Sequence, residues 1–91
     1  MVVRRCIVSG RVQGVFYRKS AQQRAREIGV SGHARNLSDG RVEVLAAGEP
    51  AAVESFVAWL WQGSSTARVT DVEVSELDPA AIQPPVGFFT G

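Results

Sequence analysis

An arginine stands in the first turn of a predicted helix, directly after a short loop with a glycine near each end. The loop covers Gly10–Val15, and Arg18 and Lys19 follow it. Glycines permit positive φ, so the loop amides can turn inward, and a helix N-terminus adds partial positive charge. A guanidinium there offers two parallel donors that match two phosphate oxygens. The pattern predicts a binding site for an anion, above all a phosphate.

The same residues exclude several other kinds of site. The loop lacks the Gly-Lys-Ser/Thr of a P-loop and the third glycine of a dinucleotide-binding fingerprint. Cys6 is the only cysteine and His33 the only histidine, so neither an internal disulfide nor a Cys/His zinc site can form. One histidine next to a predicted strand also makes no catalytic triad. We therefore expect no metal and no cofactor.

Charge is divided unevenly along the chain. Residues 1–41 carry nine Lys and Arg and two Asp and Glu, a net +7, whereas residues 42–91 carry one basic and seven acidic side chains, a net −6. A basic first half suits an anionic partner. Alternatively, the two halves interleave in space and neutralise each other, and charge alone does not decide between these readings.

Hydrophobic periodicity places the loop between a strand and a helix. We expect strands over Val2–Ser9, Gly32–Leu37, Arg41–Ala47, Arg68–Leu77 and Phe88–Thr90, and helices over Phe16–Ile28 and from Pro50 to near Gln62. Ser38, Asp39 and Gly40 are typical of a hairpin turn. The order βαββαβ predicts an α+β, ferredoxin-like sandwich: an antiparallel sheet with both helices on one face, the first and third strands central, and a short extra C-terminal strand.

Two stretches resemble the signatures of the acylphosphatase family. One is Gly10-Arg11-Val12-Gln13-Gly14-Val15-Phe16-Tyr17-Arg18, and the other runs from Gly29 to Glu43. The resemblance implies a hydrolase that cleaves the carboxyl–phosphate bond of small-molecule acyl phosphates without a metal. Three residues differ from those common in the family: Tyr17, His33 and Ala34 stand where Phe, Trp and Val are usual.

The resemblance also implies roles for individual residues. Arg18 matches the arginine that binds the phosphoryl group, and Asn36 matches the asparagine that orients the attacking water. The matching phosphate-binding residues are Gly10, Arg11, Val12, Gln13, Gly14, Val15 and Arg18. Without the resemblance, a turn-flanking residue that bonds to its own backbone is the preferred interpretation of Asn36. His33 is a surface residue rather than a general base, and Cys6 is a core residue rather than a nucleophile.

Two other functions compete with hydrolysis. A basic half on a ferredoxin-like sheet would suit RNA, but the two predicted central strands lack exposed aromatics for stacking. A non-catalytic anion sensor would keep Arg18, and Asn36 is what favours turnover. We expect a single domain over residues 1–91 that is cytoplasmic and monomeric and has neither a nucleic acid nor a membrane as partner. The lone cysteine and the charged, short N-terminal run support the compartment.

Overall fold

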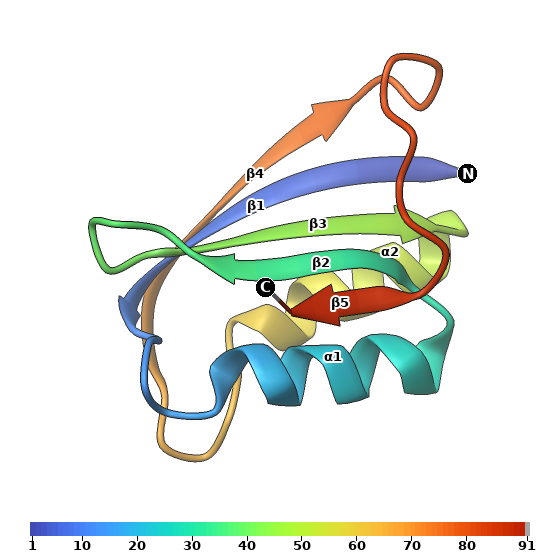
Figure 1. The fold of residues 1–91 in the computed structure, drawn as a ribbon. Coiled ribbons are helices and arrows are strands. Elements are labelled where there is room, and N and C mark those ends of the chain that lie inside the picture. The colour runs from blue at the N-terminus through green and yellow to red at the C-terminus, as the bar shows by residue number, and fades with distance from the viewer. Residues whose placement is uncertain (91) are drawn as a thin grey trace.

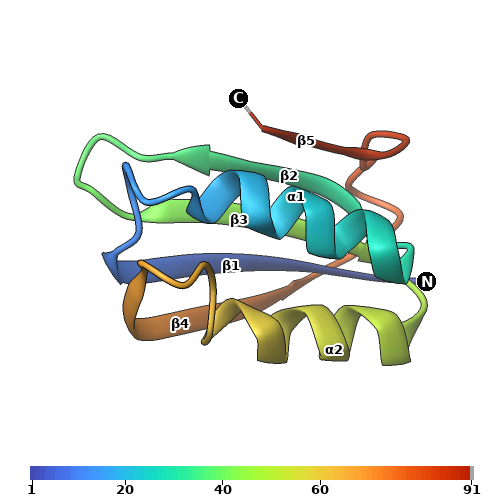
Figure 2. The ribbon, with the colours of Figure 1, turned by 90° about the horizontal axis from the view of Figure 1, so that it is seen from below.

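A five-stranded sheet with two helices on one face makes up the computed structural model, which describes residues 1–90 (Figures 1 and 2). The elements in chain order are β1 (Val2–Arg11), α1 (Tyr17–Ile28), β2 (Ser31–Asn36), β3 (Val42–Gly48), α2 (Pro50–Leu60), β4 (Arg68–Leu77) and β5 (Phe88–Thr90). The strand order in the sheet is β4-β1-β3-β2-β5. The predicted ferredoxin-like fold is confirmed, with β1 and β3 adjacent at its centre.

One strand departs from the expected antiparallel arrangement. β5 pairs parallel with β2, from Gly32 opposite Phe88 to Ala34 opposite Thr90, so the sheet is mixed. The proline-rich segment 78–87 makes this possible, because it crosses the face of the sheet opposite the helices, from the β4 edge to the β5 edge (Figure 1). Gln22 on α1 donates to the Phe88 carbonyl at 2.9 Å, which ties the short strand to the helix.

Strand β1 is longer than the sequence pattern indicates. Gly10 does not end it; the pairing with β4 shifts register between Ser9 and Gly10 and continues to Arg11 opposite Arg68. Gly10 has φ 120°, and a Cβ there would overlap the Arg68 carbonyl. Glycine is therefore needed at this bulge because the β4 backbone comes close. The connecting loop is left with residues 12–16.

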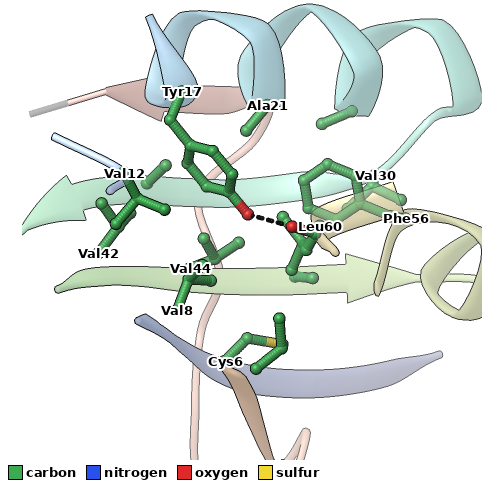
Figure 3. Packing of buried hydrophobic residues seen from close by; sticks show 14 of the residues in the cluster. Cys6, Val8, Val12, Tyr17, Ala21, Val30, Val42, Val44, Phe56 and Leu60 are labelled. Carbon is green, nitrogen blue, oxygen red and sulfur yellow. Dashed lines mark hydrogen bonds between the residues drawn. The ribbon is translucent and has the colours of Figure 1, made fainter. Parts of the chain in front are cut away.

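The core lies between the helices and the sheet (Figure 3). The helical spacing of Val53, Phe56, Val57 and Leu60 predicts the apolar face of α2; Val53, Phe56 and Leu60 are fully buried, and Val57 packs partly buried against the core. The Tyr17 ring reaches from α1 into this core, and its hydroxyl donates to the Leu60 carbonyl at 2.7 Å. Burial raises the pKa of Tyr17 well above its ordinary value. The Tyr17 hydroxyl is thus accommodated by one buried hydrogen bond that joins the two helices.

Two further aromatic side chains and the cysteine belong to this core or pack against it. Phe88 is buried and meets Phe56 edge-on, with ring centroids 5.5 Å apart. Trp59 stacks on Phe56, whereas Trp61 is half exposed. Cys6 is fully buried, and desolvation raises the pKa of its thiol to about 11. The thiol is therefore protonated at neutral pH and serves as a packing group, as predicted.

Candidate active site

The loop between β1 and α1 is held in place from both sides. Gln13 Nε2 donates to the carbonyls of Leu37 and Arg41, at 2.8 and 3.0 Å, and so fastens the loop to the β2–β3 turn. On the other side, the Val15 carbonyl accepts from Ser64 Oγ at 2.6 Å and Thr66 Oγ1 at 3.1 Å. The loop is thus shaped before any ligand arrives, which lowers the cost of binding one.

The backbone of this loop leaves its donors unused. Gly14 (φ 72°) and Phe16 (φ 60°) both adopt the left-handed conformation. Among residues 1–90, no hydrogen bond takes up the amide N–H groups of Gln13 through Phe16. Val12 and Val15 are buried in the core. Buried side chains hold the loop from beneath while its amides stay available, which is the arrangement of an anion-binding nest.

The N-terminus of α1 lies beside these amides and is also uncompensated. Its N-cap residue, Phe16, makes no side-chain capping bond, and the first turn contains no acid. The first intrahelical bond runs from the Ser20 N–H to the Phe16 carbonyl, at 3.0 Å. The N–H groups before Ser20 therefore have no helical partner, and the first turn contributes no acid to offset the positive end of the helix dipole.

Two cations add to this positive centre. Arg18 is half-buried and Lys19 exposed, and neither forms an ion pair with any acid among residues 1–90. Both line a pocket of about 290 Å³. We call it the Arg18 pocket; its lining residues are Val12, Gly14, Phe16, Tyr17, Arg18, Lys19 and Thr90. Free amides, a helix N-terminus and two cations suit a small dianion.

Asn36 lies beside the loop but outside the lining of the Arg18 pocket. It ends β2 opposite Val42, whose side chain belongs to the core, so Asn36 points to the helix-covered face of the sheet. Its neighbour Leu37 receives the hydrogen bond from Gln13. The end of β2, the loop and the start of α1 all lie at one end of the molecule (Figure 1). Asn36 is exposed, and no side-chain hydrogen bond within residues 1–90 involves its amide.

Two of the predicted phosphate-binding residues lie apart from this pocket. Gly10 is engaged in the β-bulge against β4. Arg11 pairs with Arg68 across the two strands, and both line a separate depression of about 370 Å³ with Ser65, Thr66 and Ala67. Val12, Gln13, Gly14 and Val15 do form the loop. Of these four, Val12 and Gly14 line the Arg18 pocket, whereas Gln13 and Val15 do not.

Four residues that line the pocket lie outside the predicted set: Phe16, Tyr17, Lys19 and Thr90. Thr90 reaches the pocket because β5 runs parallel beside β2, and no sequence pattern indicates that pairing. Phe16 was expected to begin the helix, but instead it precedes it in a left-handed conformation. Its adjacency to Arg18 is the only signal in the sequence that could have drawn attention to it.

A second group of cations lies on the other face of the sheet. Glu43 is only 5% exposed and accepts hydrogen bonds from Arg5 Nε at 2.7 Å, Arg35 Nε at 2.8 Å and His33 Nε2 at 3.0 Å. We call these four residues the Glu43 cluster. Alternation along β2 puts His33 and Asn36 on opposite faces, so His33 is no candidate base for a ligand beside Asn36. Burial opposes ionisation of Glu43, but hydrogen bonds from His33 and Arg5 and the charge of Arg35 outweigh it and lower its pKa to about 2.

The Glu43 cluster also accounts for part of the uneven charge of the sequence. Arg5 and Arg35 of the basic half meet Glu43 of the acidic half, and Arg4 meets Glu76 at 3.5 Å. Two acids of the second half, Glu43 and Glu76, thus pair with three arginines of the first, whereas Arg18 and Lys19 at the pocket pair with no acid of the described residues. Within residues 1–90, no group of three or more His, Cys, Asp or Glu side chains is arranged to hold a metal ion. Nor does that part of the chain contain a helix long and apolar enough to cross a membrane.

Known proteins share this sequence and this fold. The family model described as Acylphosphatase matches residues 4–88. The chain is 54% identical over 85 residues to an acylphosphatase of Alkalilimnicola ehrlichii. The aligned residues make up 93% of this chain and 92% of that protein. It is 50% identical over 91 residues to one from Xanthomonas oryzae pv. oryzae, across the full length of both. The crystal structure of acylphosphatase from Bacillus subtilis superposes with a TM-score of 0.93 at 38% identity, covering 100% of this chain and 99% of that one. The chain therefore belongs to the acylphosphatase family.

Proposed function

We propose that this acylphosphatase hydrolyses the carboxyl–phosphate bond of its substrate at the Arg18 pocket, with Arg18 and Asn36 as its catalytic residues. The observation that carries the proposal is the convergence of unused donors there: loop amides, an uncapped helix N-terminus and Arg18 without an acid partner. Groups of this kind, fixed in advance, stabilise the charge that develops on a transferring phosphoryl group.

Beyond these donors, the reaction requires few catalytic groups from the protein. Water attacks phosphorus, a new P–O bond forms as the bond to the acyl oxygen breaks, and the electron pair leaves with the carboxylate. A carboxylate is a weak base, so departure needs no general acid. The products are the carboxylate and inorganic phosphate, and a phosphate oxygen receives the proton of the water. Catalysis then rests on positioning and on charge stabilisation, and no metal is required.

Asn36 is assigned to the attacking water. An amide side chain can accept a hydrogen bond from water through its oxygen and donate to substrate through its nitrogen. The position of Asn36, at the end of β2 on the face where the loop and α1 lie, supports this role. Its amide is also free of other protein partners within residues 1–90. The family signature also includes Gly10 and Arg11 among the phosphate-binding residues that we propose. These two residues end β1, directly before the loop.

Hydrolysis of benzoyl phosphate tests the proposal. We expect turnover that is unchanged by a chelator, and Asn36→Ala should lower kcat/KM by roughly 10²-fold, the loss typical of one positioned transition-state contact. Ser38→Ala, in the adjacent turn, is the matched control and should retain wild-type activity. Loss of activity with chelator would contradict the metal-free reaction, and full activity of Asn36→Ala would contradict the role of Asn36.

The wider setting belongs to the same proposal. We take residues 1–91 to act as one domain, a cytoplasmic monomer whose partner is the small substrate rather than nucleic acid. One continuous hydrophobic cluster supports the single domain. The lone, buried, protonated Cys6 suits a reducing compartment. Sedimentation equilibrium should give the mass of one chain. Against RNA, the two arginines of the open sheet face are already bound to Glu43.

A further inference from the structure

Phe16 is the one large apolar side chain of the loop that lies outside the core. Val12, Val15 and Tyr17 on either side of it are buried, whereas Phe16 is 76% exposed. A single exposed apolar residue on a surface needs no explanation. Phe16, however, is one of the residues that line the Arg18 pocket, two positions before the arginine to which we assign the phosphoryl group.

The backbone conformation of Phe16 is unfavourable for a phenylalanine, so the stability of the fold does not explain why this residue stands there. Its φ of 60° is a left-handed conformation, and every other residue of positive φ in the described chain is a glycine. A bulky residue is a genuine outlier there, because its Cβ crowds the neighbouring backbone. Glycine would meet the same backbone without strain, and no core contact calls for an aromatic ring. Strain of this kind persists where the side chain contributes to a functional site.

The pocket has two chemically different ends, and so has an acyl phosphate. Arg18, Lys19 and the free amides form the cationic end, and Phe16 lines the same pocket with its side chain exposed to solvent. An exposed phenyl ring at this position is an apolar surface available to a bound ligand. When the phosphoryl group occupies the cationic end, the acyl group must extend along the wall of the pocket. An aromatic ring attracts another ring placed in offset or edge-on contact, and it gains little from a single methyl group.

We propose that Phe16 selects the acyl group of the substrate, favouring acyl phosphates with an aromatic or bulky apolar acyl group over acetyl phosphate. This inference rests on the proposed function and names the substrate class of the same site. It assigns Phe16 a role in specificity that is separate from the charge stabilisation supplied by Arg18.

The test compares two substrates in two enzymes. The ratio of kcat/KM for benzoyl phosphate to that for acetyl phosphate is measured for the wild type and for Phe16→Gly. Glycine suits the left-handed backbone, so the variant keeps the loop. We expect the ratio to fall about tenfold, which corresponds to about 1.4 kcal/mol. Phe16→Leu should lie between the two. Trp61→Ala, which removes another half-exposed aromatic outside the pocket, should leave the ratio unchanged.

Inhibition by inorganic phosphate separates selection from loop damage. Phosphate carries no acyl group, so its inhibition constant should change far less than the substrate ratio. An unchanged ratio in Phe16→Gly would overturn the inference while the proposed function stands. So would an equal loss for both substrates together with weaker phosphate inhibition, because Phe16 would then only shape the loop. A wild type that hydrolyses neither substrate would overturn the proposed function, and this inference with it.

Discussion

Two groups of cationic side chains lie on opposite faces of this molecule, and they differ in whether an acid accompanies them. In the Glu43 cluster, two arginines and a histidine surround one buried carboxylate. In the Arg18 pocket, two cations and a helix N-terminus have no acid partner within residues 1–90. The charges of the first group are compensated within the protein, whereas the positive potential of the second group is available to an anionic ligand.

The two groups also have opposite effects on the stability of the folded protein. The cations of the Glu43 cluster stabilise an ionised Glu43, so they strengthen the folded state. Arg18 and Lys19 stand at the positive end of α1, where basic residues are unfavourable. An arrangement that weakens its own helix is expected where function requires it. The arginines of the Glu43 cluster thus have a structural role, whereas the unpaired Arg18 has none that its ion pairs reveal.

The largest expected effect separates the two groups by activity. Arg18→Gln should lower kcat/KM for benzoyl phosphate by roughly 10² to 10³-fold, because a charged donor to the transition state is lost. Arg35→Gln is the matched control: the same substitution in the Glu43 cluster should keep activity within about threefold, since that arginine lies on the far face of the sheet. Comparable losses in both variants would contradict the distinction.

Stability should respond in the opposite way. Glu43→Gln removes the carboxylate that three donors share, and we expect it to lower the free energy of unfolding by roughly 3 kcal/mol at pH 7. Urea denaturation followed by tryptophan fluorescence measures this. Asp39→Asn, which breaks the exposed pair of Asp39 with Arg41, should cost far less. Activity of the folded Glu43→Gln enzyme should persist.

The same residue gives the comparison a pH dependence. The pKa of Glu43 is about 2 in the folded protein and near its ordinary 4.5 in the unfolded chain, so the unfolded state binds the proton more readily. The stabilisation is therefore complete above about pH 5 and is lost as the pH falls toward 2. The gap between wild type and Glu43→Gln should shrink across that interval. A gap that stays constant from pH 7 to pH 3 would show that charge is not its source.

Much of the fold and the centre of the site could be predicted from local patterns. The spacing of Val53, Phe56 and Leu60 indicates the buried face of α2, and the glycine-rich loop before Arg18 indicates the anion site. These signals work because helix periodicity and turn chemistry are local properties of the chain. Phe16 and Arg18 stand two positions apart in the sequence, so no tertiary contact is needed to bring them together.

The remainder depends on contacts between distant segments. Glu43 follows the alternating pattern of an exposed strand residue, and only the pairing of β3 with β1 and β2 brings Arg5 and Arg35 to it. A glycine at position 10 is compatible both with the end of a strand and with a β-bulge. Only the close approach of the β4 backbone shows that Gly10 forms a bulge. Thr90 enters the pocket through the parallel pairing of β5, which follows an irregular segment without periodicity.

The smallest expected effect tests whether the Arg18 pocket is kept positive at the expense of the helix. Lys19→Glu puts an acid in the first turn of α1, which should raise the free energy of unfolding by about 0.5 kcal/mol and weaken inhibition by inorganic phosphate. Arg26→Glu makes the same exchange in the last turn, where a basic residue is favourable, and should lower stability by a similar amount. If Lys19→Glu destabilised the protein and left phosphate inhibition unaltered, Lys19 would be an ordinary surface residue. Opposite signs in the two variants, with phosphate inhibition weakened only in the first, would show that the pocket holds its charge for the ligand.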